Sequence, residues 1–295
     1  MARPVWPGFL ALTLIWGTTW AVIRIGLEGL PPFAAAALRF AVAAAVLAPV
    51  VWKLRIPLGA GTGEKRLWLA STVFNFIGSY GVVYWAEQYV PSALAAVIFA
   101  TFPLFVSVLA HFFLPAERLG GRQQLGVFLG FVGVVLLFSD DLTFQGGPML
   151  PVAAAVFLLS PFCSAVGQIL IKRWGEGVHP LSLALVPQAC AALFFTATTF
   201  TVERPSEIEL TVPAVLSFLY LGAFGSALAF YLYFTLLKRM PATRLALITY
   251  LNPVVAVAVG SLFMGERLGP SIFAGAAAIL LGVALASRGA AKPTA

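Results

Sequence analysis

The sequence predicts an all-α polytopic membrane protein. Of its 295 residues, 61% are hydrophobic and only 10% are charged. An average soluble domain carries about 25% charged residues, so this chain lacks the polar side chains that would cover a globular surface. Long apolar runs rich in Ala and Leu recur along it, without the alternation of a membrane β-strand. Disorder is excluded as well, because it needs low hydrophobicity and high charge.

Ten apolar runs are long enough to cross a bilayer, which takes about 20 helical residues. The expected spans are 6–26, 33–52, 67–89, 91–114, 122–139, 148–171, 180–200, 211–237, 241–264 and 269–287. The residues at the breaks, in order, are Glu28 and Pro31; Lys53 and Arg66; Glu87 and Pro91; Glu117 and Arg118; Asp140 and Asp141; Lys172 and Arg173; Glu203 and Glu209; Lys238 and Arg239; and Glu266 and Arg267. The first run has no small-residue cleavage site between Trp16 and Ile25, so we expect a span there and not a removed signal peptide.

The basic residues predict the orientation of the spans. With the N-terminus placed in the cytoplasm, 13 of the 18 Lys and Arg residues fall inside, 3 fall outside, and Arg39 and Arg244 lie within spans. Positive charge favours cytoplasmic loops, so both termini are expected in the cytoplasm and the protein in the cytoplasmic (inner) membrane. The net charge of +7 is spread singly or in pairs between apolar blocks. We therefore expect the lipid bilayer as a partner and no nucleic acid.

The motifs of soluble enzymes are missing from the sequence. It contains no phosphate-binding glycine loop, no HExxH and no CxxC, and its two histidines, His111 and His179, belong to different spans or loops. Its two cysteines lie in apolar runs and cannot form a disulfide framework. We expect no catalytic residue, no metal site and no cofactor.

An internal repeat divides the chain. Residues 90–120 and 240–269 align through two prolines and an ERLG tetrapeptide. The matching positions are Pro91 with Pro241 and Pro103 with Pro253, at an offset of 150, and Glu117–Gly120 with Glu266–Gly269, at an offset of 149. The repeat predicts ten transmembrane helices as two five-helix halves, residues 1–147 and 148–295. Because five is odd, the second half is expected to be inverted, as in secondary transporters that bind substrate between their halves.

These motifs resemble those of a known family. The first span contains WGTTW at 16–20, and the stretches YVPSALAAVIFATFPLF…ERLG and MPATRLALITYLNP…GERLG follow in the two halves. Together they are similar to the EamA branch of the drug/metabolite transporter superfamily. The resemblance covers the whole chain and implies ten helices, inverted halves and export of small metabolites from bacteria. The aromatic-rich spans resemble the aromatic and neutral amino-acid exporters of that branch. The sixth span departs from the family, with Ser160-Pro161 in place of a Trp-Ala opening.

Two prolines are candidate hinges. Pro103 and Pro253 lie midway along the fourth and ninth spans, where a proline removes a backbone hydrogen bond and bends the helix. Bends at equivalent places would let helix segments tilt separately during alternating access. The alternative is that the membrane helices simply tolerate proline. Thr101 and Asn252 lie beside the expected bends and could bind the freed carbonyls or the substrate.

Polar and aromatic residues within the spans predict a substrate pocket. Flat apolar walls with a few hydrogen-bonding groups suit a small amphipathic ligand. The candidates are Trp16, Trp20, Asn75, Ser79, Tyr80, Tyr84, Ser164, Gln168, Tyr231, Tyr250 and Asn252. Packing is the alternative for the two tryptophans. Ser160, Ser164 and Gln168 share one helix face, which predicts either a cavity or hydrogen bonds between helices.

Charged groups are scarce inside the spans. All eleven acidic residues lie in loops or near span ends, so we expect transport driven by the substrate gradient alone. His111, near the cytoplasmic end of the fourth span, is either a satisfied or snorkelling histidine or a proton relay. Arg39 is expected to be paired or to snorkel, in preference to binding a substrate carboxylate.

The sequence thus predicts a monomeric secondary transporter with a small-molecule substrate. We expect export of aromatic or other neutral amino acids by alternating access, and no enzyme activity. Carriers of sugars, nucleotide sugars or phosphorylated metabolites are an alternative, although such anions call for more basic residues within the spans. An integral-membrane lipid-modifying enzyme would need polar clusters at the interface. A receptor or channel fits the inverted halves poorly.

Overall fold

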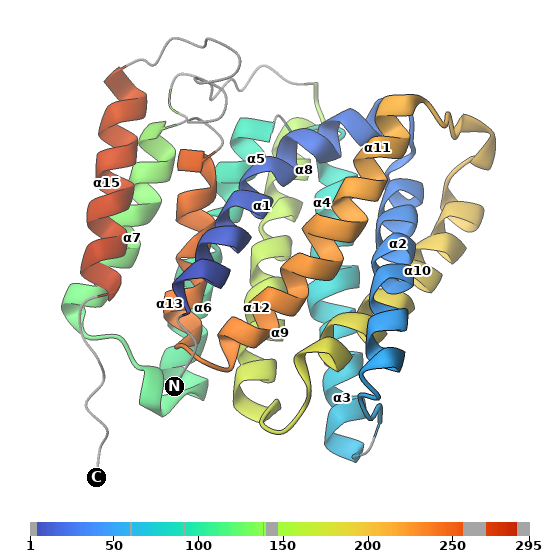
Figure 1. Ribbon diagram of the computed structural model, residues 1–295. Helices are drawn as coiled ribbons and strands as arrows, with labels where there is room; N and C mark the ends of the chain where they lie inside the picture. Colours follow the sequence, from blue (N-terminus) through green and yellow to red (C-terminus); the bar gives the residue numbers. More distant parts are fainter. Residues whose placement is uncertain are drawn as a thin grey trace.

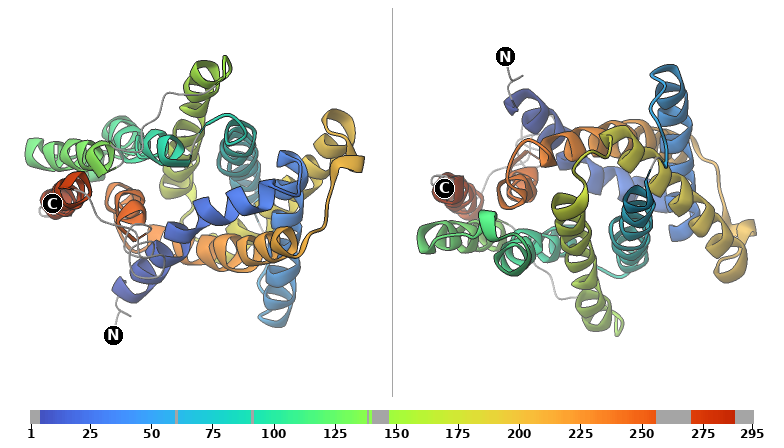
Figure 2. Two further views of the ribbon diagram at one scale, coloured as in Figure 1. Left: turned by 90° about the horizontal axis from the view of Figure 1, so that it is seen from above. Right: turned by 90° about the horizontal axis from the view of Figure 1, so that it is seen from below.

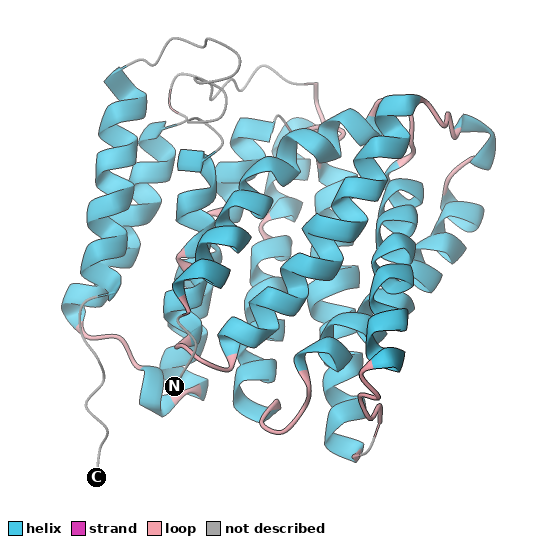
Figure 3. Cartoon of the chain, viewed as in Figure 1, coloured by secondary structure: helices cyan, strands magenta, loops and turns pink. Residues whose placement is uncertain are grey.

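The computed structural model describes residues 5–59, 61–90, 92–137, 139, 147–255 and 270–287. In these residues the regular structure is helical and contains no strand (Figure 3). The helices stand side by side in one bundle (Figure 1). The prediction of an all-helical protein is confirmed for this part of the chain.

The helices follow the expected runs. The first half contains α1 (Trp6–Leu27), α2 (Pro32–Lys53), α3 (Thr62–Ala70), η1 (Ser71–Gly78), α4 (Ser79–Ala86), α5 (Ser92–Phe99), α6 (Phe102–Phe113), η2 (Pro115–Glu117) and α7 (Gly121–Leu137). The second half contains α8 (Leu150–Phe157), α9 (Leu159–Trp174), α10 (Pro180–Val202), η3 (Pro205–Glu207), α11 (Val212–Tyr220), η4 (Leu221–Leu228), α12 (Ala229–Leu237), α13 (Ala242–Ala246) and α15 (Pro270–Ser287). Here η1 and η4 are π-helical, and η2 and η3 are short 3₁₀ turns.

Eight helical stretches are long and apolar enough to cross a membrane. They are Trp6–Leu27, Pro32–Lys53, Gly63–Ala86, Leu94–Phe113, Leu150–Trp174, Pro180–Val202, Val212–Leu237 and Pro270–Ser287. The fifth expected span is the shorter apolar helix Gly121–Leu137. The ninth expected span, 241–264, is described only as far as residue 255. Pro91 and the second ERLG tetrapeptide lie outside the described residues.

Equivalent spans of the two halves run in opposite directions. In Figure 1, α1 rises through the bundle, whereas α8 and then α9 descend. Likewise α3 leads upward into α4, whereas α11 leads downward into α12. The ends of α2, α9 and α12 and the start of α3, which carry most of the basic residues counted as cytoplasmic, all lie at the lower end of the bundle.

The third and eighth spans each contain a π-helical segment at the same place. The segment η1 covers 71–78 and η4 covers 221–228, so their offset is the 150 residues of the sequence repeat. A π-helical turn is wider than an α-helical turn and is frequent at functional sites. The two halves therefore share an unusual backbone conformation as well as sequence motifs.

The proline-containing spans differ from the expected pair of matched bends. A two-residue turn at Ala100 and Thr101 interrupts the helix of the fourth span, and Pro103 occupies the first turn of α6. The ninth span breaks at Leu247, six residues before Pro253, and is helical again over 248–255. The expected bend at Pro103 is thus a helix break, whereas the break in the ninth span does not occur at Pro253. Thr101 does not bind the carbonyl that Pro103 leaves free, which is that of Phe99. Its Oγ1 donates to Ile98 O at 2.7 Å, and Ile98 O also accepts from Thr101 N at 3.1 Å.

Glycines bring α7 and α15 into backbone contact at one edge of the bundle (Figure 2). A Cβ atom added at Gly126 would lie 2.5 Å from the main-chain nitrogen of Ala286. One added at Gly133 would lie 2.6 Å from that of Ile279. Small residues let membrane helices approach closely, and these glycines allow α7 and α15 to pack in backbone contact.

Candidate functional site

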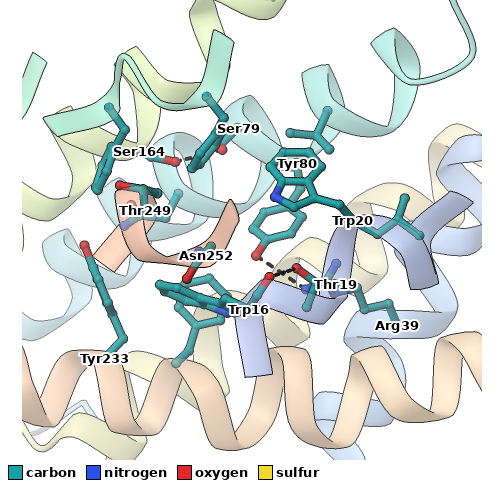
Figure 4. Close-up of a pocket in the computed structure, with 16 residues that line it drawn as sticks. Trp16, Thr19, Trp20, Arg39, Ser79, Tyr80, Ser164, Tyr233, Thr249 and Asn252 are labelled. Carbon is teal, nitrogen blue, oxygen red and sulfur yellow. Dashed lines mark hydrogen bonds between the residues drawn. The ribbon is translucent and has the colours of Figure 1, made fainter. Parts of the chain in front are cut away.

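A cavity lies inside the bundle between the two halves (Figure 4). It is formed by α1, α2, η1, α4, α5 and α6 of the first half and by α9, α12 and residues 248–255 of the second. Its lining residues are Trp16, Thr19, Trp20, Ile23, Arg39, Asn75, Ser79, Tyr80, Val83, Phe99, Phe102, Ser164, Phe230, Tyr233, Thr249 and Asn252. Aromatic rings and aliphatic side chains form most of the wall, and one guanidinium and several hydroxyl and amide groups interrupt it.

Two tryptophans of α1 form part of the aromatic wall of the cavity. Trp16 and Trp20 are one turn apart, so both indoles can reach the same side of the helix. Trp16 donates through Nε1 to Gly225 O at 3.3 Å, and its ring centroid is 5.3 Å from that of Tyr233. Trp20 meets Phe99 edge to face, with centroids 5.6 Å apart. The two tryptophans therefore pack against neighbours and also line the cavity.

Three serine hydroxyls form a cluster between α4 and α9. Ser164 Oγ donates to Ser79 Oγ at 2.8 Å, and the hydroxyls of Ser79 and Ser160 are 3.0 Å apart. Ser79 and Ser164 face the cavity, whereas Ser160 is fully buried behind them. The polar face of the sixth span thus joins two helices, and Ser164 also borders the cavity.

Asn75 reaches the cavity because a neighbouring glycine leaves room for it. A Cβ added at Gly167 of α9 would lie 2.4 Å from the Asn75 amide. Asn75 Nδ2 donates to Ser71 Oγ at 3.1 Å within η1. Asn252 borders the opposite side of the cavity, and its Oδ1 is buried with no hydrogen-bond partner in the part of the chain that the structure describes.

Arg39 was expected to be paired or to snorkel; it lies in the interior, bonded to polar neighbours, and does not snorkel. Its side chain is 1% exposed. Its Nε donates to Ser226 Oγ at 2.6 Å and its NH2 group to Gly225 O at 3.2 Å. The guanidinium carbon lies 4.7 Å from the centre of the Tyr80 ring, and Figure 4 shows these two side chains meeting at the cavity. A guanidinium within the second span, flanked by aromatic rings, is therefore part of the cavity wall.

Seven of the eleven predicted pocket residues line the cavity, and four do not. Tyr84 is buried behind it, with its hydroxyl 3.5 Å from an Arg39 nitrogen. Gln168 donates instead to Ala242 O at 2.9 Å. Tyr250 turns away toward α7, where its hydroxyl donates to Val127 O at 2.9 Å. Tyr231 is half-buried against the core outside the cavity. Sequence alone could not fix how each helix is rotated, and that rotation separates these four from the wall.

His111 lies on the surface of the protein and not at the cavity. It is exposed on the surface near the end of α6, and its carbonyl accepts from Arg118 Nε at 3.0 Å. Its ring lies against Phe112, with centroids 5.3 Å apart. The histidine does not line the cavity, so this geometry gives the proton-relay prediction no support.

Several cavity residues escaped the sequence analysis. They are Thr19, Ile23, Val83, Phe99, Phe102, Phe230, Tyr233 and Thr249. Thr19 lies inside the WGTTW motif, and Thr249 comes three residues before Asn252, so their positions carried a usable signal. The phenylalanines carried none, because this chain contains 25 of them.

Glu87 is a buried carboxyl that directly follows α4 and the third candidate span. Its side chain is 1% exposed, and neither carboxylate oxygen has a hydrogen-bond partner among the described residues. Arg24 of α1 donates to its main-chain oxygen at 3.1 Å, not to its carboxylate. Burial raises the pKa of Glu87 to about 8, and the nearby charges of Arg24 and Arg39 oppose the rise.

Glu87→Gln is therefore expected to stabilise the protein in alkaline solution. Because the native pKa exceeds the ordinary value of 4.5, stability is fully present below that value and falls as pH rises through about 8. The neutral amide does not titrate. Thermal unfolding in detergent should show a higher midpoint for the variant near pH 9 and a similar midpoint near pH 5, in line with the same linkage. An equal difference at both pH values would contradict the expectation.

Comparison with known proteins identifies the family. Residues 7–139 and 152–288 each match the EamA-like transporter family. The chain belongs to this family. It is a membrane transporter with two EamA repeats, and the boundary between the two matches falls where the two halves of the sequence meet.

Three relatives of this EamA-family transporter span nearly its whole length. It is 29% identical to a probable amino-acid metabolite efflux pump of Escherichia coli K12, over 94% of this chain and 93% of the relative. It is 29% identical to the uncharacterized inner membrane transporter YedA of the same strain, over 97% and 91%. It is 27% identical to the protein PagO of Salmonella typhimurium, over 88% and 85%.

A solved crystal structure shares the fold. It superposes with a TM-score of 0.83 and covers 96% of this chain and 98% of its own, at 21% sequence identity. At that identity the likeness concerns the fold alone. It extends over the whole bundle, including both halves that enclose the cavity.

Proposed function

We propose that this transporter exports aromatic or other neutral amino acids across the bacterial cytoplasmic membrane. The cavity carries the proposal. It combines the indoles of Trp16 and Trp20 with a few hydrogen-bonding groups, which suits a ligand with an apolar ring and a polar end. A relative named as a probable amino-acid metabolite efflux pump supports the same substrate class.

The mechanism we propose is alternating access between two inverted halves, with ten membrane crossings and both termini in the cytoplasm. Its support is that residues from both halves line the cavity, so rocking one half against the other would change access to it. Helix breaks at Ala100–Thr101 and Leu247 provide places where segments next to the cavity can tilt, and Pro103 and Pro253 follow these breaks. The protein works as a monomer, because one chain encloses the whole site.

The proposal is tested by counterflow in proteoliposomes. Vesicles loaded with unlabelled tryptophan, tyrosine, phenylalanine or leucine are diluted into labelled amino acid, and transient accumulation of label shows carrier exchange. A channel would give a leak without accumulation, and an enzyme would release a modified product. Absence of counterflow with every amino acid tested would contradict the proposed substrate class.

Trp20→Ala is expected to slow this exchange about tenfold or more, because losing one aromatic wall removes at least about 1.4 kcal/mol of binding. Trp52→Ala is the matched control. Trp52 lies at the end of α2 with 83% of its surface exposed, and it does not line the cavity. Equal loss of transport in both variants would remove Trp20 from the binding site.

A further inference from the structure

We propose that the Arg39 guanidinium binds the carboxylate of the transported amino acid. This inference rests on the proposed function and specifies how the substrate is recognised. Arg39 is the one basic residue among those that line the cavity in the described part of the chain. It enters from α2, in the first half, and reaches η4 of the second half.

All hydrogen-bond partners of this guanidinium are neutral. They are the Ser226 hydroxyl at 2.6 Å, the Gly225 carbonyl at 3.2 Å and the hydroxyls of Tyr80 and Tyr84, both at 3.5 Å. Among the described residues, no carboxylate lies within salt-bridge distance of Arg39. Isolated charge is costly inside a membrane protein, and such groups commonly mark substrate or ion pathways.

Arg39 retains donor capacity for a ligand. A guanidinium carries five N–H donors in a planar fork that matches a carboxylate. Only Nε and one NH2 hydrogen make short bonds, whereas the contacts to Tyr80 and Tyr84 are at the limit of hydrogen bonding. A carboxylate that displaced the long contact to Tyr80, which lines the cavity, would gain charge-assisted bonds.

The rest of the cavity fixes the orientation of the ligand. Trp20, Phe99 and Phe102 line it together with Arg39, and they offer an apolar surface for a ring or an aliphatic side chain. One guanidinium balances the single negative charge of a carboxylate. A phosphate ester carries more charge and would call for further basic residues, which the described lining does not contain.

The first experiment uses the unaltered protein, so it does not depend on any variant folding. In proteoliposomes, labelled tryptophan and tyrosine are compared with tryptamine and tyramine, which keep the ring and the amine but lack the carboxylate. We expect the amino acids to exchange at least tenfold faster than the amines. Equal rates for acids and amines would overturn the proposal while leaving a carrier for aromatic compounds in place. Exchange of sugar phosphates without amino acids would also overturn it.

The second experiment removes the guanidinium. Arg39→Gln is expected to abolish the preference for acids over amines, so that both exchange at similar slow rates, and Arg39→Lys to recover part of it. Arg24→Gln is the matched control, because Arg24 of α1 binds a main-chain oxygen and does not line the cavity. A merely structural role for Arg39 would lower both rates and keep their ratio, and a retained ratio in Arg39→Gln would overturn the proposal.

Discussion

Gly282→Ala is expected to separate α15 from α7, even though alanine is the better helix former. A Cβ at Gly282 would lie 2.5 Å from the nitrogen of Gly130 and 2.6 Å from the carbonyl oxygen of Gly126. These are backbone atoms within a helix, so no side-chain rotation can relieve the clash and the whole of α15 must move. We expect a loss of about 3 kcal/mol or more in the free energy of unfolding, at the upper end of overpacking effects.

Gly121→Ala is the matched control for this substitution. Gly121 begins α7, and no atom of the described residues lies within 4 Å of a Cβ built there. Without a clash, the helix propensity of alanine should leave the protein unchanged or up to about 1 kcal/mol more stable. Unfolding midpoints in detergent measure both variants. Similar midpoints for Gly282→Ala and Gly121→Ala would show that the two helices do not depend on this backbone contact.

Lys172→Met is expected to loosen the two halves at the end of the bundle where α9 and α12 finish. Lys172 Nζ donates to Leu237 O at 2.8 Å and to Met240 O at 2.9 Å, and lies 3.4 Å from Glu117 Oε1. Glu117, from the ERLG motif of the first half, also accepts from Ala242 N at 2.6 Å, where α13 begins. The lysine thus neutralises a carboxylate and satisfies carbonyls at the end of α12. We expect a loss of about 2 kcal/mol, because both side chains are mostly buried.

A double-mutant cycle separates the ion pair from the other bonds. Glu117→Gln keeps an oxygen that can accept from Ala242 N but removes the charge. If the pair acts as a unit, the double variant with Lys172→Met should lose less stability than the two single variants together, with a coupling energy of at least about 0.5 kcal/mol. Strict additivity would show that Lys172 acts only through the carbonyls that it binds.

The sequence repeat predicted more of the backbone than of the site. The offset of 150 residues, first seen at Pro103 and Pro253, reappears in η1 and η4, which no hydropathy pattern indicates. The positions of the helix breaks were harder to predict. A proline cannot donate a hydrogen bond from its own nitrogen, but this does not determine at which residue the helix is interrupted. In the fourth span the break lies next to the proline, and in the ninth it lies six residues before.

For the site residues, the sequence predicted suitable residue types but not the direction in which each side chain faces. Trp16 and Trp20 could be recognised from their spacing, and both line the cavity. Tyr250 has the same chemistry but faces α7, where Gly130 leaves space for its ring. For Arg39 the sequence left pairing and snorkelling open, because both are possible for a residue at the same position along a helix.

The sequence repeat determined the division of the chain into two halves. Composition, run length and charge asymmetry by themselves determined the class of protein and the approximate course of its spans. These properties depend on the chain's contact with lipid and water, which each segment makes independently of the others. Only the tertiary structure decided which faces turn inward. It therefore decided that Arg39 meets neutral partners in the cavity and that the Glu87 carboxyl is buried with no hydrogen-bond partner among the residues described. Helix rotation depends on packing between segments more than a hundred residues apart, and no single span encodes it.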